Sequence, residues 1–161
     1  FDLVGLGSSA GRRAPLARLT ADVGREGPRV GRYTVMLSDF EGFALPILDG
    51  LEVAMHGGSE RLVCIVDEIG KMELLSPAFV TRVRGLLRAR PAPLLVTVAL
   101  HGQGLIAEAK ETQGFELIML DESTRNVAPD QVCERLLSGS GGGLCGNLSR
   151  PSGGGGGGGG G

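Results

Sequence analysis

Apolar and polar positions in the first part of the chain predict two strands and then a long helix. Residues 1–6 ("FDLVGL") and 29–37 ("RVGRYTVML") have the pattern of strands. In the helix, Ser38 or Asp39 is the expected N-cap, and Pro46 is expected to kink the helix or to divide it in two. The apolar stripe of this helix consists of Phe40, Phe43, Ala44, Ile47, Leu48 and Leu51, and residues 56–60 ("HGGSE") form a loop.

Strands and helices alternate from residue 61 onward. The apolar run at 61–67 ("RLVCIVD") is typical of a central parallel strand that is covered on both faces. Ser76 is expected to cap, and Pro77 to open, a helix that extends to about Arg90. Strand 93–100, helix 105–114, strand 115–120 and helix 128–137 follow. This order predicts an α/β fold, with an open, mostly parallel sheet, helices on both faces and ligands beyond the carboxyl ends of the strands.

Composition narrows the class of protein. The chain has 161 residues, enough for one domain, which we expect at 1–138, followed by a glycine-rich disordered tail at 139–161. A net charge of −2 gives no reason to expect a nucleic-acid partner, and no apolar run is long enough to span a membrane. The odd number of cysteines, without close spacing, indicates free thiols in the reducing cytoplasm: Cys64, Cys133 and Cys145.

Two adjacent carboxylates end the strand at 61–67. Asp67 could hold Mg²⁺ through the water shell of the ion, and Glu68 could orient or deprotonate an attacking water. The same pattern also fits a strand that ends in two solvated acids. Lys71, in the turn that follows, is either a phosphate contact or an exposed lysine paired with Glu68 or Glu73, and charge alone favours the second interpretation.

A glycine-rich phosphate loop is absent from these 161 residues. The P-loop pattern G-x-x-x-x-G-K-[ST] needs a lysine after a glycine, because the backbone amides wrap the phosphates and the lysine bridges two of them. Lys110 follows Ala109, and Lys71 precedes Met72, so neither lysine fits. In this fold class the loop joins the first strand to the first helix. We therefore expect those elements to precede Phe1, and their absence to leave the sheet with an uncovered apolar edge or face.

Other candidate groups give weaker signals. The stretch "GLGSSAG" (5–11) has the glycine spacing of a dinucleotide fingerprint, but no helix pattern follows it, so a turn between two antiparallel strands is the better prediction. Arg125 could reach a base or a phosphate and Asn126 a base, or the segment could simply cap a helix beside a surface arginine. His56 and His101 have no metal-ligand spacing to an acid or a cysteine.

Segments 29–48 ("RVGRYTVMLSDFEGFALPIL") and 61–84 ("RLVCIVDEIGKMELLSPAFVTRVR") resemble the cancer-related nucleoside-triphosphatase family, a small P-loop NTPase family with vertebrate, thermophilic bacterial and archaeal members. Residues 1–19 resemble an internal β-hairpin segment of that family. "TRNVAP" (124–129) resembles the segment after its last strand, with Ala128 where leucine is usual. The resemblance covers about residues 1–138, and "DEIGKMEL" (67–74) is its most specific part.

The resemblance implies a slow Mg²⁺-dependent hydrolase that converts nucleoside triphosphates, ATP and GTP among them, to diphosphate and phosphate with broad base preference. It also implies a cytoplasmic monomer with no nucleic-acid or membrane partner. Asp67 would be the Walker B acid near Mg²⁺ and Glu68 the catalytic base. The implied nucleotide-binding residues are Cys64, Ile65, Val66, Asp67, Glu68, Ile69, Gly70, Lys71 and, after the last strand, Arg125.

This chain departs from the family pattern because the Gly-Lys-Thr loop has no counterpart, so we expect it to be inactive as it stands. One alternative is a non-catalytic isoform or fragment that binds nucleotide weakly or serves as an interaction module. A second is a nucleotide kinase, which would need an arginine-rich acceptor site and a lid. Four arginines lie on one predicted helix and are expected to form its solvated face instead: Arg82, Arg84, Arg88 and Arg90.

Overall fold

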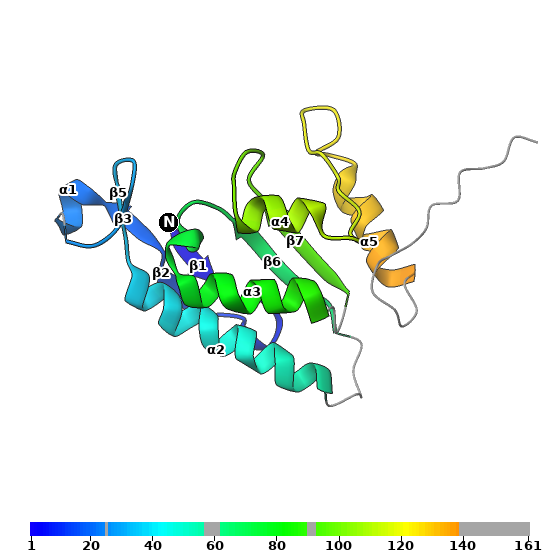
Figure 1. Cartoon of the computed structure of the whole chain (residues 1–161), viewed down its shortest axis with the longest axis horizontal. Helices are drawn as coiled ribbons and strands as arrows, with labels where there is room; N and C mark the ends of the chain where they lie inside the picture. The colour runs from blue at the N-terminus through cyan, green and yellow to red at the C-terminus, as the bar shows by residue number, and fades with distance from the viewer. Residues whose placement is uncertain (25, 57–61, 90–92, 139–161) are drawn as a thin grey trace, which may run out of the picture.

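The computed structural model describes residues 1–24, 26–56, 62–89 and 93–138. Within these ranges the chain forms an N-terminal part with two small antiparallel sheets and a second part with a parallel strand pair and helices (Figure 1). Residues 57–60 of the predicted loop and the predicted tail at 139–161, with Cys145, lie outside the described residues. No helix in the described ranges is both long and apolar enough to cross a membrane.

The N-terminal residues form a hairpin and a three-stranded sheet. Strands β1 (Asp2–Val4) and β2 (Arg13–Pro15) pair antiparallel, and the 3-10 turn η1 (Gly7–Ser9) lies between them. The prediction of a turn at 5–11 is therefore confirmed. Strand β5 (Tyr33–Val35) pairs antiparallel with both β3 (Ala17–Leu19) and β4 (Arg29–Val30), and the short helix α1 (Thr20–Val23) follows β3. The strand expected at 29–37 is thus two short strands that meet at a turn.

Helix α2 (Leu37–His56) is longer and less interrupted than the sequence indicated. It begins at Leu37, so Ser38 and Asp39 lie in its first turn, and the prediction that one of them is the N-cap is wrong. It also continues through Pro46, which therefore does not divide it. Pro46 and Gly42, one turn earlier, are both exposed. Water can therefore hydrate the Gly42 carbonyl, which has no amide partner at position 46.

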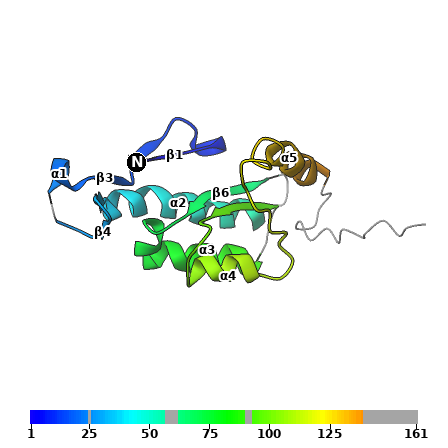
Figure 2. The same cartoon turned by 90° about the horizontal axis from the view of Figure 1, so that it is seen from above.

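The second part of the chain is built around two parallel strands. Strand β6 (Cys64–Ile69) pairs in parallel with β7 (Leu94–Val98), and the turn η2 (Glu73–Leu75) and helix α3 (Pro77–Ala89) connect them. The predicted helix start is confirmed, because α3 begins at Pro77 and the Phe79 N–H donates to Ser76 Oγ over 3.0 Å. Helices α4 (Leu105–Glu111) and α5 (Ala128–Ser138) follow, and α3 and α4 lie on the same side of the strand pair (Figure 2).

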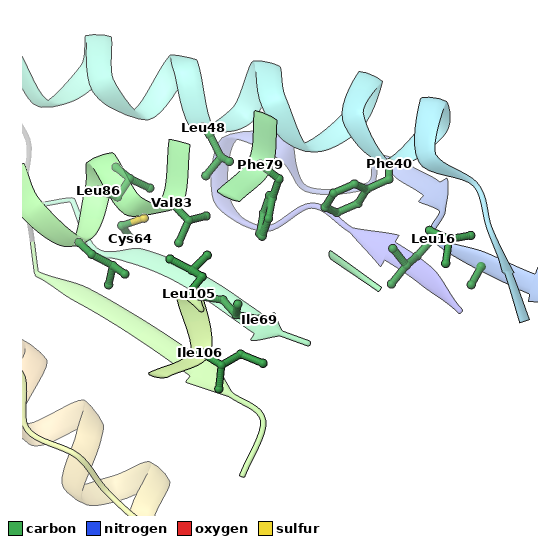
Figure 3. Close-up of a cluster of buried hydrophobic side chains, with 13 residues drawn as sticks. Leu16, Phe40, Leu48, Cys64, Ile69, Phe79, Val83, Leu86, Leu105 and Ile106 are labelled. Carbon is green, nitrogen blue, oxygen red and sulfur yellow. The ribbon is translucent and has the colours of Figure 1, made fainter. Parts of the chain in front are cut away.

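A single hydrophobic core joins α2, α3, α4 and β6. The rings of Phe40 on α2 and Phe79 on α3 have centroids 5.1 Å apart, which fixes the two helices side by side. Cys64 and Ile69 enter the same core from β6, and Leu105 and Ile106 enter it from α4 (Figure 3). These contacts hold the carboxyl end of β6 in place, because Ile69 is 0% exposed there.

One face of the strand pair is open within the described residues. Cys64 is buried on the helix side, whereas its neighbours Val63 and Ile65 are 40% and 48% exposed. Successive residues of a strand point to opposite faces, so these two side chains mark the uncovered face. The expectation of a central strand covered on both faces does not hold for β6 in the described ranges, where the exposed Val63 and Ile65 agree with an uncovered apolar face.

Residues 115–120 do not form the predicted strand. Their apolar side chains Leu117, Met119 and Leu120 are exposed instead of packed in a sheet. A strand needs a neighbour that pairs with its backbone N–H and C=O groups, and in the described ranges no strand pairs with this segment. The strand predicted at 115–120 is therefore wrong, because an apolar run cannot by itself supply a partner strand.

Candidate active site at the carboxyl end of β6

The two predicted site carboxylates lie in a β-bulge. Val66 pairs with Val96 and Ile69 pairs with Val98, so β6 holds one more residue than β7 between these two pairs. Asp67 and Glu68 together oppose Thr97. A bulge bends the strand and re-aims the side chains within it, and bulges are common next to active sites. The strand therefore extends two residues beyond the predicted end at Asp67, because Ile69 returns to the core.

Asp67 is held by a neighbouring strand. The Thr97 hydroxyl of β7 donates to Asp67 Oδ1 over 2.7 Å, and the carboxylate is otherwise exposed. The hydrogen bond fixes one oxygen and so limits the directions in which the other can point. An exposed, oriented carboxylate of this kind suits a hydrated cation, which needs only one or two carboxylate ligands.

Glu68 has an unusual backbone conformation. Its φ is 89°, and among the described residues it is the one non-glycine residue with positive φ. Such a conformation costs about 1–3 kcal/mol and persists only where the surrounding structure fixes it, most often at functional sites. The side chain is exposed. The structure therefore keeps a strained glutamate at the carboxyl end of a parallel strand, where ligands of α/β sheets bind.

A second glutamate lies directly behind this position. Glu73 in η2 is 7% exposed, and its Oε2 accepts the Gly70 N–H over 3.0 Å. Burial raises the pKa of the Glu73 carboxyl above its ordinary value, and the Glu68 charge raises it further, while hydrogen bonds from the Glu73 and Gly70 N–H groups partly oppose the shift. The ionised form of Glu73 is therefore disfavoured relative to a carboxyl in water.

The remaining predicted site residues are not all brought together. Lys71 is exposed and, in the described part of the chain, forms an ion pair with neither Glu68 nor Glu73. The side chains of Cys64 and Ile69 belong to the core, while Val66 is half-buried and Ile65 lies on the open face. Arg125 is exposed, and no hydrogen bond or ion pair given for the described residues connects it to Asp67 or Glu68.

Two polar groups of the site were missed in the sequence. Thr97 is the one polar residue in the otherwise apolar strand "LLVTV" (94–98), and that contrast was a usable signal. Glu73 stands between apolar residues in "MELL" (72–75), where a charged residue at a buried position implies a specific partner. Neither signal reveals the partner itself, because Thr97 and Asp67 are 30 residues apart in sequence.

The donor atoms at the bulge fit Mg²⁺. Asp67, Glu68 and Thr97 offer carboxylate and hydroxyl oxygens, which are the donors that this hard cation prefers. The described residues contain no group of three or more histidine, cysteine, aspartate or glutamate side chains placed to enclose a metal ion. The described residues therefore do not enclose a metal ion on all sides, and the oxygens at the bulge suit a Mg²⁺ ion that keeps most of its water ligands.

The fold and the site define an α/β protein with an acidic bulge at the carboxyl end of a parallel strand. The family model described as NTPase matches residues 1–133, and the chain belongs to this family. It is similar to the human cancer-related nucleoside-triphosphatase, with 36% identity over 138 residues that cover 82% of this chain and 70% of the relative. It is also similar to the nucleoside-triphosphatase THEP1 of Methanosarcina acetivorans, with 30% identity over 69% of this chain and 58% of the relative.

Two solved structures share the fold. The crystal structure of THEP1 from Aquifex aeolicus matches with a TM-score of 0.70 and 28% identity, over 78% of this chain and 72% of that one. The solution structure of a human cancer-related nucleoside triphosphatase matches with a TM-score of 0.60 and 32% identity, over 87% of this chain and 75% of that one. The mixed α/β fold predicted from the sequence is thereby confirmed.

Proposed function

We propose that this chain carries the acidic part of the catalytic site of a nucleoside-triphosphatase, which converts a nucleoside triphosphate and water to the diphosphate and phosphate. The observation that carries the proposal is the bulge at the carboxyl end of β6, where Asp67 and the strained Glu68 stand side by side. Membership in the NTPase family and the names of the relatives support the same reaction class. The substrates we propose are ATP, GTP and other nucleoside triphosphates.

In this reaction Glu68 orients the attacking water and accepts its proton, which its exposed carboxylate can do as a general base. Asp67 serves as the Walker B acid, and Thr97 keeps its carboxylate in one orientation. Mg²⁺, when bound, neutralises the charge that develops on the transferred phosphoryl group. Lys71 and Arg125 are the proposed cationic contacts to the nucleotide, because both side chains are exposed.

The lysine-bearing phosphate loop that the reaction needs does not occur in the 161 residues. We therefore propose that turnover requires such a loop from sequence joined upstream, and that this chain alone is inactive or binds nucleotide weakly. We also propose a monomer in the cytoplasm. A kinase is less well supported, because Arg82 and Arg84 form ion pairs with Asp49 and Glu108 on neighbouring helices. These arginines are thus engaged on the surface of α3.

The test is Mg²⁺-dependent phosphate release from ATP and GTP, measured on this chain and on a chain extended upstream through a Gly-Lys-Thr loop. Glu68→Gln in each chain removes the proposed base while it keeps the size of the side chain. Loss of a general base lowers the rate by about 10²–10⁴-fold. The matched control is Glu111→Gln on α4, because Glu111 is exposed and lies outside the bulge.

We expect activity in the extended chain only, with loss in Glu68→Gln and full retention in Glu111→Gln. Glu68-dependent activity in the 161-residue chain would show that phosphate is held in another way. Equal activity of the extended chain and its Glu68→Gln variant would remove Glu68 from the role of base. Nucleotide binding without hydrolysis in both chains would favour the non-catalytic binding module.

A further inference from the structure

Glu73 is a buried carboxyl that the proposed chemistry does not use. It is 7% exposed in η2, five residues after Glu68, and it lies where a hydrophobic residue would be expected. Burying a carboxyl group is unfavourable unless hydrogen bonds replace those of water. The Gly70 N–H supplies one such bond to Glu73 Oε2 over 3.0 Å. One oxygen of the buried Glu73 carboxyl therefore has a hydrogen-bond partner next to the bulge.

The carboxyl groups of Glu68 and Glu73 converge on Gly70. A Cβ atom at position 70 would stand 2.9 Å from Glu68 Oε1 and 2.9 Å from Glu73 Oε2. Cβ atoms essentially never make contacts this short, so an alanine at position 70 would require at least one of the two carboxyl groups to move. Glu73 Oε2 is fixed by its hydrogen bond, whereas Glu68 is exposed. Of the two carboxylates, Glu73 is thus the one that a hydrogen bond holds in place, and both approach the same side of Gly70.

The backbone around Glu68 is fixed on both sides. Val66 is paired with Val96 before the bulge, and Ile69 is paired with Val98 after it. Beyond Ile69, the Gly70 carbonyl accepts the Leu74 N–H over 3.3 Å, and the Gly70 N–H donates to the Glu73 carboxyl. Both backbone polar groups of Gly70 are therefore bound by the next turn. The positive φ of Glu68 therefore lies between a paired strand and a closed turn, which is the support that a strained residue needs.

We propose that Glu73 is a positioning residue for Glu68: its buried carboxyl closes the Gly70–Leu74 turn, holds the bulge in the positive-φ form and limits where the Glu68 carboxylate can lie. The proposal rests on the proposed function, since the group positioned is the proposed general base. Glu73 itself does not touch the substrate in this scheme. Its contribution is to keep the base in one place, and a misplacement of about 1 Å can lower a catalytic rate on the order of 10²-fold.

The experiment compares Glu73→Gln, Glu73→Leu and Gly70→Ala by NMR in the 161-residue chain and by phosphate release in the upstream-extended chain. Glu73→Gln keeps an oxygen that accepts the Gly70 N–H, whereas Glu73→Leu keeps a similar volume without an acceptor. Two NMR signals report the geometry. They are the protection of the Gly70 amide from hydrogen exchange and the strong contact between the amide and α protons of Glu68 that positive φ produces.

We expect Glu73→Gln to retain both NMR signals and a kcat within about threefold of wild type. Glu73→Leu should lose both signals and lower kcat on the order of 10²-fold with KM unchanged. A Glu73→Leu variant that stays folded, keeps the Glu68 signal and keeps kcat would overturn the proposal, because Glu73 would then only fill the core. If the wild-type extended chain releases no phosphate, the proposed function fails, and the NMR signals still decide whether Glu73 holds Glu68.

Gly70→Ala covers the case in which Glu73→Leu does not fold. The added Cβ would lie 2.9 Å from both carboxylates, and because Glu73 is held by its hydrogen bond while Glu68 is exposed, we expect Glu68 to be the one that moves, with a loss of kcat and little change in Tm. Wild-type kcat and an unchanged Glu68 signal in Gly70→Ala would show that the convergence on Gly70 does not position the base. That result would also overturn the proposal.

Discussion

Replacing Ser76 by alanine should destabilise the fold through one buried hydroxyl group with two partners. Ser76 is 0% exposed, accepts the Phe79 N–H over 3.0 Å and donates to Glu41 Oε1 over 2.7 Å. It therefore caps α3 and ties that cap to α2. Loss of a serine cap costs about 1 kcal/mol, and a hydrogen bond to a charged group contributes about 1.5–3 kcal/mol. We take the low end for the second contribution, because Glu41 is half-buried and water can replace the hydroxyl.

The expected loss is about 2–3 kcal/mol in the free energy of unfolding, or roughly 6–12 °C in Tm for a domain of this size. Urea unfolding followed by circular dichroism measures it. Thr81→Ala is the matched control on the same helix, because Thr81 is exposed and its hydroxyl bonds only the Pro77 carbonyl in the described structure. Its effect should stay within about 0.5 kcal/mol.

A double-mutant cycle separates the two partners of Ser76. Glu41→Ala alone removes the acceptor but leaves the cap of α3, so it should cost less than Ser76→Ala. The combined variant should cost less than the sum of the two single changes, since both remove the same hydrogen bond. The reasoning is refuted if Ser76→Ala stays within 0.5 kcal/mol of wild type, or if the two single effects add without coupling.

Two further predictions follow from buried titratable groups. Burial raises the pKa of the Cys64 thiol, whereas Cys133 is exposed. At pH 8, iodoacetamide should therefore label Cys133 in the folded chain and Cys64 only in urea, as measured by peptide mass spectrometry. Equal labelling of both cysteines in the folded chain would contradict this prediction. Burial also raises the pKa of Glu73 above its ordinary value of 4.5. The resulting contribution to stability is fully present below pH 4.5, where Glu73 is protonated, and it is lost as the pH rises through the raised pKa of the folded state. Thermal unfolding at several pH values should therefore show Glu73→Gln gaining on wild type as pH rises above 4.5, whereas a pH-independent difference would argue against a shifted carboxyl.

The sequence predicted the start of α3 and the position of β6 well because local signals and tertiary structure agree there. Ser76 and Pro77 mark a helix start by rules that act within one turn, and α3 begins where they place it. The apolar run before Asp67 marks β6 for the same reason. Pro46 shows the limit of such rules, because α2 buries an apolar face against α3 and β2, and that burial outweighs the loss of one backbone hydrogen bond.

The strand predicted at 115–120 failed for a different physical reason. Helices satisfy their own backbone groups, so a periodic pattern nearly suffices to predict them. A strand needs a neighbour, and the sequence of 115–120 contains no information on whether one lies beside it. The large apolar side chains Leu117, Met119 and Leu120 are consequently exposed in the described structure.

At the site, too, the sequence predicted the features that depend on neighbouring residues and missed those that depend on residues far apart in the chain. Asp67 and Glu68 were named from the sequence because their chemistry is carried by the residue types and by their place after an apolar run. The bulge was not foreseen, although Ile69 contained a hint, since an apolar residue after two acids favours a return to the core. What makes the pair a site is the register with β7, the Thr97 hydroxyl and the Glu73 carboxyl behind Gly70. The proposed roles of Asp67 and Glu68 therefore depend on Thr97, Gly70 and Glu73, which lie outside the acidic pair, and we expect substitutions at these three positions to change catalysis without removing a proposed catalytic group.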